Sequence, residues 1–197
     1  MKLFSVLLLQ LVGASVALEG ISLDAEVSAV SESQCVCTSV PCPTVGKNTL
    51  QNGGDASVIY YYANHSGFAV VTSAKGTITP KSLDQGTGTT VCTRAYSRML
   101  DDDGAKDCDA GHILANRLGG LGTEPLNIFP QDLGVNRGLY AQFEDDIHDC
   151  VTSGASSANL QWHFEYESTK RTMPSRVKYA AHFIGGTCTE LSASFDN

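Results

Sequence analysis

The spacing of apolar side chains predicts several β-strands along the chain. Residues 160–167 and 177–183 alternate strictly between apolar and polar side chains, which is typical of half-buried strands. The segments 57–63 and 67–72 are rich in β-branched and aromatic residues and predict two further strands. Residues 89–96 are another strand candidate by the same composition.

One segment has the period of a helix instead. Between residues 136 and 151, the apolar residues Leu139, Phe143, Ile147 and Cys150 recur every three to four positions. A helix with this pattern buries one face and leaves the other polar. The sequence contains no internal repeat and no low-complexity tract. The pattern as a whole predicts an α+β fold, an antiparallel β-sheet with a helix packed on it.

The N-terminal region lacks this patterning. Residues 1–17 contain Lys2, an apolar run and a small-residue site at 15–17, which is the arrangement of a secretory signal peptide. A membrane anchor is the alternative, but the run is shorter than the roughly 20 apolar residues that span a bilayer. We expect a secreted, extracellular protein that has no membrane association after cleavage. We further expect an irregular segment over residues 18–56 and one domain over residues 57–197.

Two features fit export. The first is a set of seven cysteines beyond the signal peptide: Cys35, Cys37, Cys42, Cys92, Cys108, Cys150 and Cys188. In an exported chain they predict disulfides; six can form three bridges, and the seventh leaves a covalent dimer open. The first three are a possible zinc site, but they lack the paired C-x2-C spacing of a zinc ribbon.

The second feature is the turn Asn64-His65-Ser66, an N-glycosylation sequon that would place a glycan on Asn64.

The net charge does not favour nucleic-acid binding. The formal net charge is −8, whereas proteins that bind phosphate backbones are usually basic. Part of the excess lies in the run Asp101-Asp102-Asp103, which is best interpreted as a solvated loop. A bound divalent metal can supply local positive charge that a residue count omits. The acidity therefore argues against tight binding without excluding catalysis on a phosphodiester.

The candidate chemistry lies between Cys108 and Cys150. Each polar residue there has a structural explanation when taken alone: Asn136 is a good helix cap, and Glu144 fits a solvated helix face. Gly119, Gly120 and Gly122 lack the lysine of a phosphate-binding P-loop and fit an ordinary glycine turn.

The order and spacing change this interpretation. His112 ends a probable strand, and Asn136 begins the predicted helix. Glu144 follows eight residues later, only about 80° around the helix axis at 3.6 residues per turn. Asn136 and Glu144 can therefore face one cleft.

The stretch Cys108–Cys150 resembles the DNA/RNA non-specific endonucleases of the ββα-metal (His-Me finger) superfamily. Their motif reads Asp-Arg-Gly-His, then Asn-x-x-Pro-Gln, then a helix that opens with Asn-x-Gly and carries Glu eight residues after that Asn. This chain has Asp109-Ala-Gly-His112, Asn127-Ile-Phe-Pro-Gln131, Asn136-Arg-Gly138 and Glu144. The subgroup with Ala-Gly-His and a Gly-Gly-x-Gly turn is especially similar.

The resemblance implies a role for each matching residue. His112 would be the general base, and Asn136 the single protein ligand of Mg²⁺, with Mn²⁺ or another divalent cation as alternatives. Glu144 would order the waters of the metal, and DNA and RNA would be the substrates.

The remaining matches, Asp109, Asn127 and Gln131, would belong to the substrate-binding part of the site, where Asn127 and Gln131 would mainly shape the active-site loop. One departure is Ala110, which stands where the family has arginine. Arg137 is our candidate for the missing guanidinium, with Arg94 and Arg98 as alternatives.

Two rival functions remain. A non-catalytic secreted effector on a nuclease-like scaffold fits the acidity and the missing arginine, but has no need of His112, Asn136 and Glu144 together. A hydrolase of another kind lacks support, because the sequence has no G-x-S-x-G elbow and no H-E-x-x-H pair. A papain-like cysteine nucleophile is disfavoured by the hypothesis that Cys108 and Cys150 form a bridge holding the motif strand near the helix.

Overall fold

Six antiparallel strands form the main sheet of the computed structural model, which describes residues 37–100 and 108–197. Their spatial order is β1-β2-β3-β6-β7-β8, and each strand pairs with its neighbour in antiparallel register. Their bounds are β1 Gly46–Gln51, β2 Ser57–His65, β3 Phe68–Ile78, β6 Ser157–Glu165, β7 Arg176–Ile184 and β8 Leu191–Asp196. The α+β prediction is confirmed. The expected signal peptide, residues 18–36 and the Asp101–Asp103 run lie outside the described residues.

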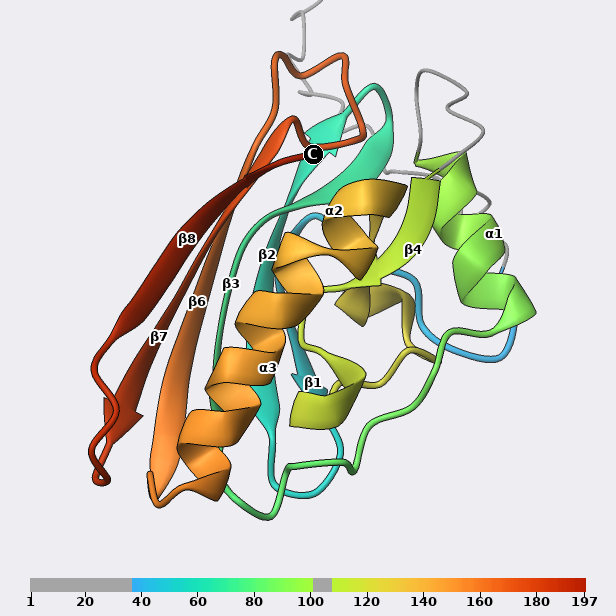
Figure 1. The fold of residues 1–197 in the computed structure, drawn as a ribbon. Helices are drawn as coiled ribbons and strands as arrows, with labels where there is room; N and C mark the ends of the chain where they lie inside the picture. The colour runs from blue at the N-terminus through green and yellow to red at the C-terminus, as the bar shows by residue number, and fades with distance from the viewer. Residues whose placement is uncertain (1–36, 101–107) are drawn as a thin grey trace, which may run out of the picture.

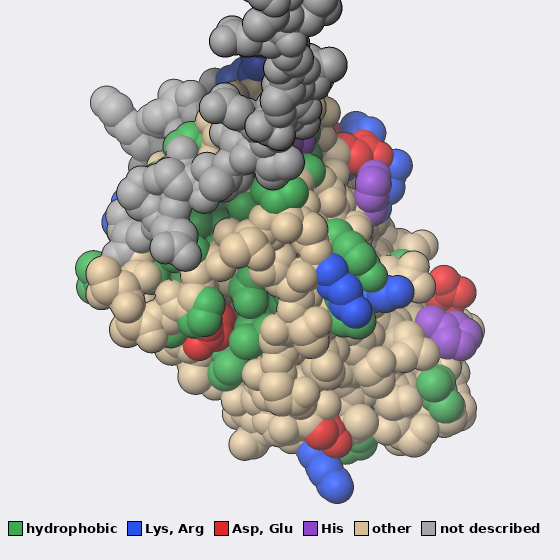
Figure 2. Space-filling model, turned by 180° about the vertical axis from the view of Figure 1, so that it is seen from behind, with side chains coloured by type: hydrophobic (Ala, Val, Ile, Leu, Met, Phe, Trp, Pro, Cys, Tyr) green, Lys and Arg blue, Asp and Glu red, His purple; other side chains and the backbone are tan. Residues whose placement is uncertain are grey.

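Alternation creates the buried face of this sheet, as the pattern predicted. Tyr60 on β2, Trp162 on β6 and Tyr179 on β7 all point to the same side and are almost fully buried. Each such side chain contributes about 1.5–3 kcal/mol when it leaves water. The opposite face of the sheet carries exposed polar side chains. In the view from behind, charged, His and apolar side chains are scattered without one large patch of a single charge (Figure 2).

A smaller unit lies beside the main sheet. Strands β4 (Cys108–His112) and β5 (Ile128–Asp132) form an antiparallel pair, against which helix α1 (Val91–Met99) packs. Between β4 and β5 the chain makes two 3₁₀ turns, η2 (Asn116–Leu118) and η3 (Pro125–Asn127). Helix α3 (Leu139–Thr152) lies across one face of the main sheet, between that sheet and β4 (Figure 1).

Two predictions about the first half of the chain are wrong. Residues 46–51, expected to be irregular, form edge strand β1, which pairs with β2 along its whole length. Its side chains are mostly exposed, so main-chain hydrogen bonds rather than apolar alternation define it.

Residues 89–96 were predicted to be a strand, but 91–99 form helix α1. Thr90 and Thr93 make a capping box, each side chain accepting a hydrogen bond from the backbone N–H of the other. Such a cap stabilises a helix by about 1 kcal/mol. Thr93, Tyr96 and Ser97 then share one buried face at helical spacing.

The predicted helix over residues 136–151 is interrupted. A short helix α2 (Leu133–Arg137) is capped by Asp132, and Gly138 breaks it from α3 with φ −114° and ψ −112°. A Cβ at Gly138 would lie 2.6 Å from the carbonyl oxygen of Gly134, so only glycine fits this close approach. The buried face of α3 begins at Tyr140 rather than at Leu139, which is 71% exposed.

The cysteine pairing also differs from our hypothesis. Cys150, at the end of α3, is bonded to Cys188 between β7 and β8, so the bridge from Cys108 to Cys150 is wrong. A second disulfide joins Cys37 to Cys92 on α1, and Cys42 is disulfide-bonded as well. Disulfide bonding itself is confirmed. No helix within the described residues has both the length and the apolar character needed to cross a membrane.

Candidate active site

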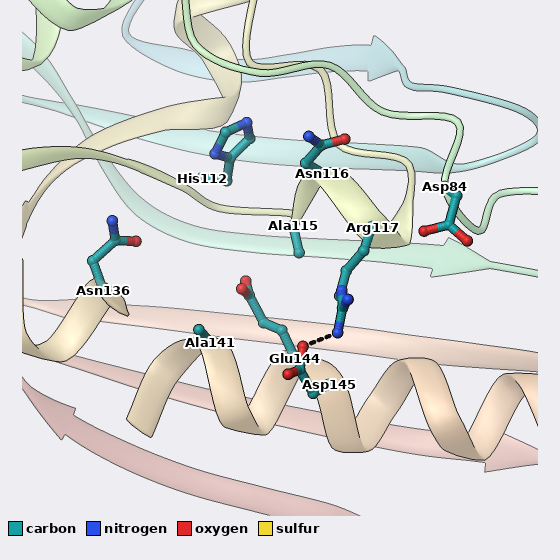
Figure 3. Close-up of a pocket in the computed structure, with 9 residues that line it drawn as sticks. All are labelled: Asp84, His112, Ala115, Asn116, Arg117, Asn136, Ala141, Glu144 and Asp145. Atoms are coloured by element: carbon teal, nitrogen blue, oxygen red, sulfur yellow. Dashed lines mark hydrogen bonds and ion pairs between the residues drawn. The ribbon is translucent and has the colours of Figure 1, made fainter. Parts of the chain in front are cut away.

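Strand β4, turn η2, helices α2 and α3 and the segment after β3 line an open polar cavity of about 410 Å³. Figure 3 shows the Glu144 carboxylate rising from α3 toward His112, with Asn136 on one side and Arg117 on the other. The lining residues are Asp84, His112, Ala115, Asn116, Arg117, Asn136, Ala141, Glu144 and Asp145. The structure thus brings together the predicted base, metal ligand and helix carboxylate.

His112 is held in one tautomer by the backbone. Its Nε2 lies 3.0 Å from the carbonyl oxygen of Thr87. A carbonyl can only accept a hydrogen bond, so Nε2 carries the proton and Nδ1 keeps its lone pair. Burial lowers the pKa of His112 below its usual value, against the opposing effect of the Thr87 hydrogen bond. The imidazole is therefore neutral near pH 7, as a general base requires.

The glycine turn gives His112 its space. A Cβ on Gly122 would stand 2.5 Å from His112 Nε2 and 2.7 Å from the Thr87 carbonyl oxygen. A Cβ on Gly120 would stand 1.6 Å from the carbonyl oxygen of Leu114. Gly119 has a φ of 100°, in the region that favours glycine. These glycines allow close backbone contact, which agrees with the turn interpretation.

Asn127 and Gln131 are buried and do not line the cavity. The Asn127 side chain accepts from the Leu114 N–H at 2.8 Å and donates to the Leu114 carbonyl at 2.9 Å, and Tyr60 donates to its oxygen. Asn127 therefore shapes the loop that follows His112. Gln131 packs against Gly111, and neither polar atom of its amide has a partner among the described residues.

Asn136 presents its amide oxygen to the cavity. Its Nδ2 donates to Asp109 Oδ2 at 2.9 Å, which fixes the amide and leaves Oδ1 turned toward the cavity (Figure 3). Asn136 lies in the last turn of α2 and not at a helix start, so the cap interpretation does not apply. The predicted angle of about 80° between Asn136 and Glu144 around the helix axis presumes one continuous helix, which the break at Gly138 excludes. Both residues still line the same cavity.

Arg137 points away from the cavity. It forms two parallel hydrogen bonds with Asp109, Nε to Oδ2 at 2.8 Å and a terminal nitrogen to Oδ1 at 2.9 Å. Its side chain is 66% exposed, and it does not line the cavity. Partial burial acts to raise the pKa of Asp109, but the hydrogen bonds from Arg137 and Asn136 outweigh it and lower the pKa. Asp109 thus links these two residues and stays ionised.

Glu144 has an unusual environment for a carboxylate. Its Oε1 is buried without a hydrogen-bond partner among the described residues. Burial raises the pKa of Glu144 well above its usual range, Asp145 raises it further, and Arg117 opposes them. A cation near this carboxyl group would stabilise its ionised form. An amide oxygen and a carboxylate are the hard donors that Mg²⁺ and similar cations prefer, so the residues fit a divalent metal.

Sequence reasoning missed Arg117, the cation in the cavity lining. Its guanidinium pairs with Asp145, the residue after Glu144 (Figure 3). The sequence feature that could have identified Arg117 is its position in the loop between His112 and the glycine turn.

Comparison with known proteins agrees with this geometry. The profile of the family described as DNA/RNA non-specific endonuclease matches residues 50–183. The chain belongs to this family. The resemblance inferred from the motif is confirmed, and the family is one of nucleases.

One sequence relative and two solved structures are similar to this chain. The chain is 37% identical over 121 residues to the probable deoxyribonuclease RhsA of Dickeya dadantii, a match that covers 61% of this chain and 8% of that protein. NucA from Streptococcus agalactiae, solved with magnesium bound, matches with a TM-score of 0.51 and 16% identity, covering 82% of this chain and 86% of NucA. The metal-free NucA structure gives 0.52 and 16%, over 80% and 83%. At this identity NucA shows the fold alone.

Asn64 lies outside the nuclease site. It is exposed at the β2–β3 hairpin, where its Oδ1 accepts a hydrogen bond from the Gly67 N–H at 3.0 Å. Its Nδ2, the atom that a glycan would modify, makes no hydrogen bond among the described residues. Glycosylation there stays a prediction.

The close approach of Gly122 to His112 allows a test of how the imidazole is positioned. We expect Gly122→Ala to lower plasmid cleavage by about 100-fold, because its Cβ displaces the imidazole and a misplacement of 1 Å can cost that much. The control is Gly88→Ala, whose Cβ would meet nothing within 4 Å and which should cleave like the wild type. Equal activity of the two variants, in folded protein, would contradict this account.

Proposed function

We propose that the protein is a divalent-metal-dependent endonuclease that hydrolyses phosphodiester bonds in DNA and RNA without strong sequence preference. One observation carries the proposal: a neutral imidazole, the Asn136 amide oxygen and the Glu144 carboxylate line one polar cavity. A non-catalytic binder would not require this combination.

His112 acts first in the proposed reaction. Its Nδ1 takes a proton from a water in the cavity, and the oxygen of that water attacks the phosphorus while the bond to the leaving oxygen breaks. The Thr87 carbonyl stabilises the imidazolium that forms, because it accepts the Nε2 hydrogen bond. Such general base catalysis typically contributes 10²- to 10⁴-fold.

Asn136 and Glu144 would hold the metal, preferentially Mg²⁺. Asn136 would supply its amide oxygen to the metal, and Glu144 would accept hydrogen bonds from water in the cavity. The metal, when bound, stabilises charge on the phosphate and on the leaving oxygen. Its positive charge also offsets the local acidity of Glu144 and Asp145, which would otherwise repel the substrate.

Arg117 takes the role of the guanidinium missing at position 110. It lines the cavity on the side of Glu144 opposite Asn136, and its ion pair with Asp145 keeps it directed there. A guanidinium binds phosphate oxygens with two parallel hydrogen bonds. Arg137 is committed to Asp109 and acts indirectly, through the residue that orients Asn136.

We also propose that the mature protein is secreted after removal of residues 1–17. The apolar N-terminal run and its small-residue site support this, and the disulfides fit an oxidising compartment. Sequencing the N-terminus of protein collected from the medium of an expressing culture should give Leu18. An intact Met1, or retention in the membrane fraction, would overturn the proposal.

The decisive assay uses the full-length chain produced in a secreting host. The purified product is incubated with plasmid DNA or total RNA, in Mg²⁺ or in excess EDTA, beside the His112→Ala variant. We expect degradation of both substrates that requires metal and falls by about 10²- to 10⁴-fold in the variant. Intact substrates across several divalent metals, from protein shown to be folded, would favour the non-catalytic alternative.

The same substitution at Arg117 and at Arg137 tests which guanidinium contacts the phosphate. We expect Arg117→Ala to lower kcat/KM roughly 100-fold, because an interaction with the transferring phosphate is lost. Arg137→Ala should lose less than about tenfold, since Asp109 still accepts the Asn136 hydrogen bond. The reverse order of effects would assign the phosphate contact to Arg137, as the sequence suggested.

A further inference from the structure

The core beneath the cavity contains an unexplained group of polar atoms. Four buried side-chain atoms there have no hydrogen-bond partner within the described part of the chain: Tyr140 Oη, Glu144 Oε1, Trp162 Nε1 and Tyr179 Oη. Buried polar atoms are nearly always hydrogen-bonded, to protein or to ordered water. Four such atoms from neighbouring side chains therefore require a common explanation.

These side chains come from three adjoining elements. Tyr140 and Glu144 are four residues apart on α3 and so lie on one side of the helix. Trp162 on β6 and Tyr179 on β7 are cross-strand partners beneath that helix, with ring centroids 4.7 Å apart. The rings of Tyr140 and Tyr179 are 5.7 Å apart, which closes the group between helix and sheet.

The direction of the pKa shifts agrees with this arrangement. Burial raises the pKa of both tyrosines well above the usual value, and the negative charge of Glu144 raises each pKa further. The indole N–H of Trp162 acts on Tyr140 in the opposite direction, as a hydrogen-bond donor does. The carboxylate and the indole are thus both close enough to perturb Tyr140.

The chemistry of the group is complementary. Two hydroxyls and one indole N–H can donate hydrogen bonds, and the carboxylate oxygen of Glu144 can accept them. The Trp162 N–H faces the Tyr140 hydroxyl without well-formed hydrogen-bond geometry, so the group needs a further partner to satisfy Glu144 Oε1 and the two hydroxyls. An internal water does so, because a water typically makes about three hydrogen bonds to polar groups that otherwise lack partners.

We propose that Tyr140, Trp162 and Tyr179 form a positioning cluster that holds Glu144 Oε1 through internal water. The cluster fixes the carboxylate so that Oε2 is presented to the cavity and to the waters of the metal. This inference rests on the proposed function for its metal, and it adds three positioning residues from the hydrophobic core. Partners of this kind typically change metal affinity or activity by 10- to 100-fold.

The test compares tyrosine-to-phenylalanine variants of the full chain. Tyr140→Phe and Tyr179→Phe each remove only a hydroxyl, and Tyr96→Phe is the matched control. The hydroxyl of Tyr96 is also buried without a partner among the described residues, but it lies in a separate core cluster with Leu100 and Ile128. Mn²⁺ affinity is measured by titration without substrate, and kcat and KM are measured with Mg²⁺ and plasmid DNA.

We expect each cluster variant to raise the Kd for Mn²⁺ by about tenfold and to lower kcat about tenfold with KM unchanged. Their melting temperatures should also fall, because a water that was bound loses a partner. Tyr96→Phe should match the wild type in Kd and kcat. Cluster variants that behave like Tyr96→Phe would overturn the proposal.

A second measurement does not depend on any variant. A high-resolution crystal structure of the wild type should show an ordered water within hydrogen-bond distance of Glu144 Oε1 and at least one of the three donors. A dry gap there would overturn the inference. Wild-type protein that binds Mn²⁺ but cuts no nucleic acid would instead overturn the proposed function, and the Kd comparison would still decide the role of the cluster.

Discussion

The buried side chain of Asn127 holds the loop on which the site depends. Its amide pairs with both backbone groups of Leu114, and its own carbonyl accepts the Ile113 N–H, so the chain leaving β4 is fixed against η3. The loop then folds back until Gly120 accepts from the Thr87 N–H and Gly122 donates to the Thr87 carbonyl. That carbonyl also accepts from His112. One buried amide and a glycine turn thereby set both the position and the tautomer of the imidazole.

Helix α3 combines two functions on one face. Tyr140, Phe143 and Ile147 bury the helix against the sheet, and Glu144 emerges beside them with one oxygen toward the core. Packing interactions that stabilise the fold therefore also orient a carboxylate that lines the cavity. The cost is a charged group in a low-dielectric environment, which only a nearby cation or a set of hydrogen-bond donors can offset. Arg117 is a cation in the cavity lining, and the side chains of Tyr140, Trp162 and Tyr179 contain hydrogen-bond donors.

The acidity of the chain is better understood from local arrangement than from net charge. Acidic side chains gather around the cavity at Asp84, Glu144 and Asp145, where they favour a divalent cation. Arg117 is the basic side chain of that lining and is ion-paired with Asp145. In the proposed function the metal and this guanidinium together supply the positive charge that the overall composition lacks.

Sequence patterns alone were enough to predict the strands of the main sheet with strong alternation, because periodicity is a local property. Motif spacing also selected His112, Asn136 and Glu144, which the structure brings to one cavity. The sequence did not determine that α1 is a helix, since β-branched composition gave no sign of the capping box and buried face. It also did not determine the helix break at Gly138 or the disulfide between Cys150 and Cys188, which depend on close contacts in the fold. Arg117 entered the site only through Asp145, 28 residues away. Such contacts depend on how elements pack, and packing is decided by the whole tertiary structure.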